Sequence, residues 1–266
     1  MIDIVIGIDG TNSQEYKNRS VQNFCNAVRA DHVIYKPGPQ NTITGSDWIE
    51  IRDTVIRELN DIAKLYGEES FFNGYQCTVG RKNNFRFIMV GHSRGGHIVI
   101  HLAAMLKYRT HFMGLYDAVE KTTMKGDESR IIYNVDHIYH AVRDLSAGSR
   151  TSRKLNISSL LFNGAAGLVL ADYAVTKAID FGNTGTKSGD GGEYVQKTFK
   201  TSHGGVGGDE MAFKMFSVPY KDDDSCTVTF FKQNEKRVQK MQLCLSESEA
   251  ADRFIKEGAR KWEVSI

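Results

Sequence analysis

Residues 88–100 read IMVGHSRGGHIVI, and this stretch decides the fold. The chain from Phe85 to Val90 is mostly apolar, as a strand buried on both faces would be. Gly-His-Ser-Arg-Gly-Gly then interrupts the run, and from Gly95 to Leu106 apolar residues lie on nearly every side of a potential helix. The stretch therefore predicts a buried strand, a sharp turn at Ser93 and a buried helix.

Strands and helices are expected to alternate on both sides of this stretch. The expected strands cover residues 2–8, 32–35, 111–116 and 195–200, and the expected helices cover 47–66 and 134–145. Such alternation is typical of a mainly parallel sheet with helices on both faces. We therefore predict the α/β class, with an α/β-hydrolase-like sheet and a single domain over residues 1–266.

A glycine-rich region follows in the last third of the chain. Residues 164–179 are small and apolar, and residues 181–193 hold five glycines and read as a mobile loop. We interpret residues 164–192 as a lid or mobile insertion over the site. A core helix over 164–179 is the alternative.

Residues 222–266 are expected to form a hairpin followed by a helix, which the capping box Ser246-x-x-Glu249 would open. In a symmetric hairpin Cys226 would lie opposite Cys244, so a disulfide is an alternative. Two reduced thiols are the favoured interpretation, because four cysteines without a CxxC pair are few for a disulfide scaffold.

The charge balance does not favour a nucleic-acid binder. Lys and Arg number 34 and Asp and Glu 32, so the formal charge of +2 provides no basic field. The N-terminal MIDIVIGIDG lacks the basic start of a secretory signal, and no apolar run is long enough to span a membrane. The expected location is the cytoplasm, with export by a secretion machine that reads no cleavable signal as the alternative.

Ser93 lies in the pattern G-x-S-x-G, formed here by Gly91-His92-Ser93-Arg94-Gly95. In such a nucleophile elbow a strained strand-to-helix turn exposes the serine hydroxyl. Small residues at Gly91, Gly95 and Gly96 let the strand and the helix pack closely. The N–H of Arg94 is a natural oxyanion donor at the start of the helix. The alternative is a tight glycine turn that binds nothing or a phosphate.

His203 is the histidine whose place in the chain fits a general base. It follows the expected strand over 195–200, and the glycines around it would keep its loop close to the serine. A surface histidine in a flexible loop is the alternative. His92 is expected to point away from Ser93. Two sets of residues have spacings that could suit a metal, but packed histidines are favoured and no metal site is predicted: His97 with His101, and Asp136 with His137 and His140.

Asp117 is the candidate acid because it directly follows the expected strand over 111–116. It should emerge at the carboxyl edge of the sheet, as Ser93 does. A carboxylate there can fix the tautomer of the base and stabilise its imidazolium form. Asp144 and Asp209 are alternatives for this role.

Four segments together carry a resemblance to a known family: Asp9-Gly10-Thr11-Asn12, Gly91-His92-Ser93-Arg94-Gly95-Gly96, Tyr116-Asp117-Ala118-Val119 and His203-Gly204-Gly205-Val206-Gly207-Gly208. They resemble Asp-Gly-Thr, G-F-S-R-G-A, Asp-Thr-Val and His-Ser-Asp-Val-Gly-Gly-Gly in the catalytic domain of type VI secretion phospholipase effectors, also called DUF2235. A His-Ala segment of the family is echoed by His140-Ala141-Val142-Arg143-Asp144.

The resemblance implies the nucleophile Ser93, the acid Asp117 and the base His203. It also implies that the turn at Gly10 and Thr11 supplies a second oxyanion N–H beside that of Arg94. The chain departs from the family in three places: His92 replaces an aromatic residue, Gly96 an alanine, and Gly204-Gly205 a Ser-Asp pair.

The expected function is a serine hydrolase that cleaves carboxylic esters through an acyl-enzyme and needs no cofactor. Lipid or phospholipid esters come first among the expected substrates. An enzyme that cleaves them would contact a membrane surface. The alternatives are an esterase for soluble esters, a thioesterase, or a non-catalytic binding module with the same fold. No nucleic-acid partner is expected, and the sequence names no protein partner.

Overall fold

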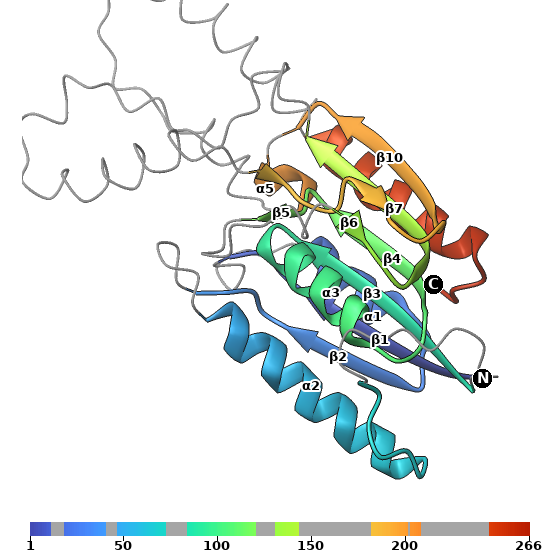
Figure 1. Ribbon diagram of the computed structural model, residues 1–266. Helices are drawn as coiled ribbons and strands as arrows, with labels where there is room; N and C mark the ends of the chain where they lie inside the picture. The colour runs from blue at the N-terminus through green and yellow to red at the C-terminus, as the bar shows by residue number, and fades with distance from the viewer. Residues whose placement is uncertain are drawn as a thin grey trace, which may run out of the picture.

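The computed structural model describes residues 1–11, 19–40, 47–72, 84–120, 131–143, 182–201, 203–208 and 245–266 (Figure 1). The central sheet contains the strands β1 (Ile2–Ile8), β2 (His32–Lys36), β3 (Phe85–His92), β4 (Thr110–Tyr116), β7 (Val135–Arg143) and β10 (Glu193–Phe199). They lie in the order β2-β1-β3-β4-β7-β10, and every neighbouring pair is parallel. The predicted α/β class is therefore confirmed, and the sheet is consistent with an α/β-hydrolase-like fold.

The order of the strands changes direction between β1 and β3. From β1 the chain adds β2 on one side of the sheet, and β3 with the later strands on the other side. Open parallel sheets bind their ligands at the carboxyl ends of the strands, next to such a switch point. The residues that follow β1 and β3, Asp9-Gly10 and Ser93, lie at this position.

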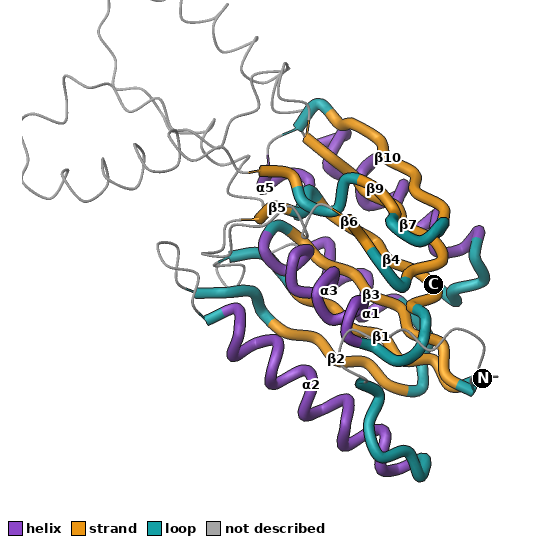
Figure 2. The backbone as a smooth tube through the Cα atoms, in the orientation of Figure 1, coloured by secondary structure: helices purple, strands orange, loops and turns teal. Residues whose placement is uncertain are grey.

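Helices cover both faces of the sheet, as Figure 1 and Figure 2 show. On one face lie α2 (Trp48–Leu65) and α3 (Arg94–Met105), which pack against each other and, in the case of α3, against β1 and β3. On the other face lie α1 (Ser20–Ala27) and a C-terminal helix over residues 245–261.

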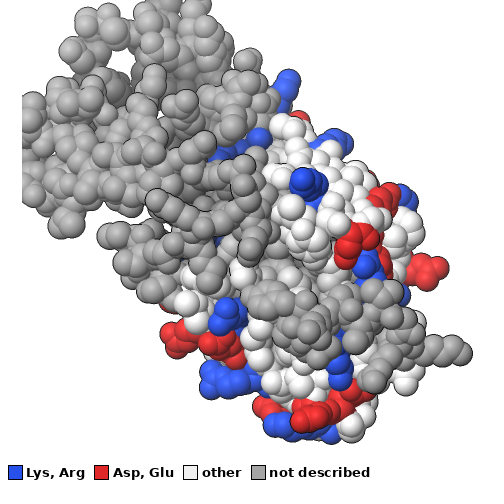
Figure 3. All heavy atoms as spheres, in the orientation of Figure 1, with Lys and Arg blue, Asp and Glu red and all other residues white. Residues whose placement is uncertain are grey.

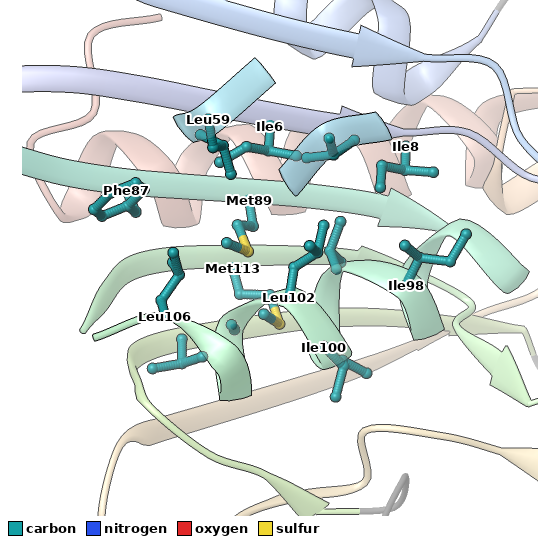
Figure 4. Close-up of a cluster of buried hydrophobic side chains, with 14 of the residues drawn as sticks. Ile6, Ile8, Leu59, Phe87, Met89, Ile98, Ile100, Leu102, Leu106 and Met113 are labelled. Carbon is teal, nitrogen blue, oxygen red and sulfur yellow. The ribbon is translucent and has the colours of Figure 1, made fainter. Parts of the chain in front are cut away.

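Apolar side chains fill the space between the sheet and the helices α2 and α3 (Figure 4). Ile6 and Ile8 of β1, Met89 of β3 and Leu102 of α3 are fully buried in this layer. Each such side chain contributes roughly 1.5–3 kcal/mol when it is removed from water. The packing holds α3, and with it the turn at Ser93, against the sheet.

Residues 135–143 form the strand β7 and not the helix expected over 134–145. β7 is hydrogen-bonded to β4 on one side and to β10 on the other. Its two faces are buried in different core clusters, Ile138 in one and Tyr139 in the other. A strand buried on both faces has apolar residues at consecutive positions, so that its sequence can also match helical spacing.

The described part of the expected lid, residues 182–192, is paired with the rest of the molecule. β8 (Gly182–Asn183) pairs with β5 (Val119–Glu120), and β9 (Lys187–Ser188) pairs with β6 (Ile131–Ile132). Asp190 accepts hydrogen bonds from Nη1 of Arg109 at 2.9 Å and from the N–H of Asn134 at 2.6 Å. This glycine-rich segment is therefore held by strand pairing and hydrogen bonds and is not a free loop. Residues 164–181 of the expected lid lie outside the described residues.

The C-terminal helix is present as expected, but it includes residue 245, so Ser246 lies within the helix and does not cap it. The preceding hairpin, with Cys226 and Cys244, lies outside the described residues. Cys25 is a free, buried thiol in α1.

Positive and negative side chains are interspersed on the face of the described part that Figure 3 shows. Among the described residues of that face, the charges of the two signs therefore do not separate into one extended field. The helices of the described residues include none with the length and apolar character that crossing a membrane requires.

Candidate active site

Ser93 occupies a strained turn between β3 and α3. Its backbone angles are φ 54° and ψ −126°, a conformation that residues with a side chain rarely adopt. The Ser93 N–H donates to the carbonyl of Tyr116 at 3.1 Å, and the Ser93 carbonyl accepts from the N–H groups of Gly96 and Val119 at 3.0 and 3.1 Å. These bonds hold Ser93 in a sharp turn between strand and helix, where the sequence predicted one.

The glycines of the elbow are required by close packing. A Cβ on Gly95 would collide with the backbone oxygens of Ile8 and Asp9, and a Cβ on Gly91 would lie 2.7 Å from the carbonyl oxygen of Gly95. A Cβ on Gly96 would lie 2.5 Å from Cβ of Ala118. Each distance is shorter than real Cβ contacts allow, so the start of α3 packs closely on β3, on the end of β1 and on Ala118.

His203 lies within hydrogen-bond distance of the serine. It begins the short helix α5 (His203–Val206), which follows β10 after a few residues. Nε2 of His203 is 2.7 Å from Oγ of Ser93. The histidine expected to act as a base thus lies where it could accept the serine proton.

Asp117 lies on the other side of the same imidazole. Its Oδ2 is 2.6 Å from Nδ1 of His203, and its side chain is completely buried. The residue follows β4 directly, has a φ of 44°, and donates its N–H to the carbonyl of Ala141 in β7 at 2.7 Å. Asp117 therefore orients His203, while the alternatives Asp144 and Asp209 lie outside the described residues.

Arg143, the last residue of β7, completes this cluster. Its Nη1 donates to Oδ2 of Asp117 at 2.6 Å, and its backbone N–H donates to Oδ1 at 3.3 Å. The same Nη1 is 2.9 Å from Nδ1 of His203. Because the Nδ1 hydrogen of His203 points at Asp117, the two nitrogens share one carboxylate oxygen and do not bond to each other.

The surroundings of Asp117 keep it ionised. Burial alone would raise the pKa of its carboxyl, but the hydrogen bond from His203 and the positive charges of His203 and Arg143 outweigh burial and lower the pKa to about 2. An ionised carboxylate stabilises the imidazolium that forms when a histidine takes up a proton.

His140 supports the segment that carries Asp117. Its Nε2 accepts a hydrogen bond from the N–H of Ala118 at 3.1 Å. Its Nδ1 is 3.2 Å from the carbonyl of Gly185 and 3.2 Å from the hydroxyl of Tyr194. Burial lowers the pKa of His140 to about 4, so the ring is neutral near pH 7 and can accept through Nε2.

The turn after β1 lies beside Ser93. A Cβ on Gly10 would be 3.1 Å from Cβ of Ser93 and 2.5 Å from Nδ1 of His92. Gly38 packs onto the same turn, because its own Cβ would collide with the carbonyl oxygens of Asp9 and Gly10. The turn is therefore confined between the loop at Gly38 and the end of β3.

Thr11 and Arg94 connect this turn to the start of α3. Nε of Arg94 donates to Oγ1 of Thr11 at 2.6 Å. The three residues that the resemblance associates with an oxyanion site, Gly10, Thr11 and Arg94, thus lie together around Ser93.

Asp9 is a buried carboxyl at the base of the turn. Burial raises its pKa to about 6, against the opposite effects of the hydrogen bond from Tyr35, the charge of Arg19 and the backbone N–H of Gly10. The Tyr35 hydroxyl donates to Oδ2 of Asp9 at 2.7 Å, and Nη1 of Arg19 donates to the Tyr35 hydroxyl at 3.2 Å. Sequence reasoning assigned no role to this network.

His97, His101, His137 and His140 make packing contacts or hydrogen bonds among the described residues. His97 and His101 pack around Trp48, with ring centroids 5.7 and 5.4 Å from the indole. In the second set, Asp136 pairs with Arg109 and His137 stacks on Trp262, whereas His140 binds Ala118. Within the described residues, no three His, Cys, Asp or Glu side chains are grouped as metal ligands would be.

The structure brings Ser93, Asp117 and His203 together, as the sequence analysis expected, and adds two residues to which the sequence analysis gave no role: Arg143, and His92, which packs against His203. The ring centroids of His92 and His203 are 5.0 Å apart. Arg143 was overlooked because β7 was expected to be helical, and only a strand places it at the carboxyl edge beside Asp117. The signal available in the sequence was the His140–Asp144 segment.

No known family model matches this chain, and no curated protein matches it in sequence. Among solved structures it is similar to the crystal structure of an uncharacterized protein from Pseudomonas aeruginosa, with a TM-score of 0.35 and 14% identity over 77% of this chain. The chain spans 41% of the length of that protein. This similarity assigns no activity to either protein.

Proposed function

We propose that this protein is a serine hydrolase that cleaves carboxylic esters through an acyl-enzyme. One observation carries the proposal: a continuous chain of short contacts runs from Oγ of Ser93 to Nε2 of His203 at 2.7 Å, and from Nδ1 of His203 to Oδ2 of Asp117 at 2.6 Å. A serine hydroxyl becomes a nucleophile when a base removes its proton and a carboxylate stabilises the protonated base.

In the first half of the reaction, Oγ of Ser93 attacks the ester carbonyl carbon and its proton moves to Nε2 of His203. The tetrahedral intermediate collapses when the bond to the alcohol oxygen breaks. His203 gives the proton to that oxygen, so the alcohol leaves neutral and the acyl group remains on Ser93.

In the second half, water takes the place of the alcohol. His203 removes a proton from the water as the water attacks the acyl carbon, and the bond to Oγ then breaks. The proton returns to Oγ of Ser93, and the carboxylic acid is released. Asp117, whose pKa of about 2 keeps it ionised, stabilises the imidazolium in both halves.

The negative oxygen of each intermediate needs nearby hydrogen-bond donors. We assign this role to the backbone N–H groups of Arg94, at the positive end of the α3 dipole, and of Thr11. The N–H of Gly10 donates a hydrogen bond to the Asp9 carboxylate instead. Gly10 therefore helps to form the oxyanion site only by bringing the backbone of its turn close to Ser93. The bond between the side chains of Arg94 and Thr11 would keep the two donors together.

A lipid or phospholipid ester is our first choice of substrate, on the basis of the sequence resemblance to type VI secretion phospholipase effectors. A soluble ester or a thioester would use the same residues. A non-catalytic module with a hydrolase-like fold is the alternative from another class. The strained turn at Ser93 favours the enzyme, because a binding module has no need to store strain at a serine that faces a histidine.

Labelling with a fluorophosphonate tests the proposal. An activated serine displaces fluoride from phosphorus, so we expect a phosphonate adduct on Ser93 in the wild type and none in Ser93→Ala. Failure of the folded wild type to label, or equal labelling of Ser93→Ala, would rule out a catalytic Ser93.

The substrate class needs a separate measurement. Wild type and Ser93→Ala should be compared on p-nitrophenyl esters of increasing acyl length and on phospholipid vesicles. Release of fatty acid from vesicles by the wild type alone supports a phospholipase. Turnover of short soluble esters without action on vesicles would assign the protein to the esterases.

A further inference from the structure

His92 lies between three parts of the candidate site. It is the last residue of β3, next to Ser93 in the chain, and its ring is buried. On one side is the turn after β1, where a Cβ on Gly10 would be 2.5 Å from Nδ1 of His92. On the other is the loop after His203, where a Cβ on Gly207 would also be 2.5 Å from the same Nδ1. The imidazole occupies space that both glycines leave open.

His92 also contacts the proposed base directly. Its Nε2 lies 3.2 Å from the backbone carbonyl oxygen of His203, and the two rings are tilted by 33°. A carbonyl only accepts, so Nε2 of His92 must carry the hydrogen. Nδ1 of His92 then bears a lone pair, and it has no hydrogen-bond partner among the described residues.

This assignment is consistent with the charge of the ring. Burial, together with the charge of His203, lowers the pKa of His92 to about 3. His92 therefore remains neutral when His203 takes up a proton, and it adds no positive charge beside the imidazolium.

The rest of the His203 loop is held by other elements. The Ser20 N–H at the start of α1 donates to the carbonyl of Gly207 at 3.0 Å, and the Ser248 hydroxyl of the C-terminal helix donates to the carbonyl of Gly205. These bonds fix the loop beyond the base. The bond from His92 acts on His203 itself and connects the base to the strand that ends at the nucleophile.

We propose that His92 is a positioning residue that sets the ring of His203 relative to Ser93 and to the turn at Gly10. The inference rests on the proposed hydrolase function, because only a base that must meet a nucleophile needs this alignment. A misplacement of about 1 Å at a reacting group can reduce a rate by about 100-fold. A neutral donor held against the backbone of His203 prevents such a displacement.

Two substitutions separate the hydrogen bond from the packing. His92→Phe keeps a flat ring but removes the donor, whereas His92→Gln replaces the ring with a chain whose Nε2 can reach the same carbonyl. His111→Phe is the matched control, because Nε2 of His111 also donates to a backbone carbonyl, that of Trp262 at 2.7 Å, at the opposite end of the sheet.

We expect His92→Phe to lower kcat and the rate of fluorophosphonate labelling about tenfold at unchanged KM, which is the effect of losing one orienting hydrogen bond. His92→Gln should recover most of the loss. His111→Phe should label at the wild-type rate, with a thermal midpoint that matches that of His92→Phe. Wild-type labelling by His92→Phe, or an equal loss in His92→Gln, would overturn the positioning role.

A measurement on the wild type alone covers the case in which a variant does not fold. Nitrogen-15 spectra of the histidine side chains should show His92 neutral, with hydrogen on Nε2, from pH 5 to pH 9. Hydrogen on Nδ1, or a cationic ring, would overturn the inference. If the wild type does not label at all, the proposed function fails; if it labels and the His92 results disagree, only this inference fails.

Discussion

Arg143 ends β7 and Asp117 directly follows the neighbouring parallel strand β4, and their side chains meet at 2.6 Å behind the proposed base. The Arg143 side chain is 10% exposed and that of Asp117 is fully buried, so water screens this ion pair little. A buried carboxylate without a partner is strongly unfavourable. Arg143 is therefore expected to hold Asp117 in its charged form and in its orientation toward His203.

Arg143→Met tests this relationship. We expect the free energy of unfolding to fall by about 3 kcal/mol near pH 8, because the substitution leaves a buried charge with less compensation. We also expect kcat for ester hydrolysis to fall at least tenfold. Arg109→Met is the control, since Arg109 pairs with Asp136 and Asp190 away from the site. An Arg143→Met variant with wild-type kcat would contradict the prediction.

Asp117→Asn should lower kcat by about 1,000-fold to 10,000-fold, because an amide cannot select the productive tautomer of His203 or stabilise its cation. The folded pKa of about 2 lies below the usual 3.8. Ionised Asp117 therefore contributes stability above about pH 4, roughly 2 kcal/mol, which is lost as the pH falls through 2. Chemical denaturation should show a larger difference from the wild type at pH 7 than at pH 2.5. Retained turnover would show that another residue is the acid.

Asp9→Asn should have the opposite dependence on pH. The folded pKa of about 6 lies above the usual 3.8, so the stability linked to Asp9 is fully present below pH 3.8 and is lost as the pH rises through 6. The variant should gain up to about 3 kcal/mol over the wild type at pH 8 and almost nothing at pH 3.5. Asp61→Asn, on the exposed part of α2, should change stability by less than about 0.5 kcal/mol at both values. A gain that is the same at both pH values would argue against a buried, titrating Asp9.

Gly207→Ala should destabilise the protein by about 1–3 kcal/mol, because its Cβ would enter the space of the His92 ring. The same change in a His92→Ala background should have little effect, since the ring is then absent. Gly67→Ala is the control. Gly67 has a φ of +74° and nothing within 4 Å of a Cβ, so its change in the free energy of unfolding reflects backbone conformation alone. Equal losses from Gly207→Ala in both backgrounds would show that the collision with His92 is unimportant.

The sequence predicted those parts of the fold that are set by local patterns. β3, the turn at Ser93 and α3 follow from one apolar run broken by glycines. β7 was predicted wrongly, because the burial of both its faces comes from the neighbours β4 and β10, which no window of sequence contains.

In the candidate site, too, only the residues that a local sequence pattern marks could be predicted. Ser93, Asp117 and His203 could be selected because each follows a strand that the sequence predicted. Arg143 and His92 could not, because their parts depend on contacts across the sheet: Arg143 meets Asp117 only when β7 lies beside β4, and His92 meets His203 only when the loop after β10 folds back over β3. Such contacts join residues far apart in the chain.

The hydroxyl of Ser248 in the C-terminal helix donates a hydrogen bond to the carbonyl of Gly205, in the short helix α5 that begins at His203. Because Ser248 lies far after His203 in the chain, this hydrogen bond forms late in synthesis. Ser93 and Asp117 emerge from the ribosome first and His203 follows. The hydrogen bonds from His92 and Ser20 can then form, but the one from Ser248 must wait for the helix over 245–261. A nascent chain that still lacks residues 245–261 has the three side chains without the hydrogen bond from Ser248. We therefore expect its proposed hydrolase activity to be lower until this helix docks.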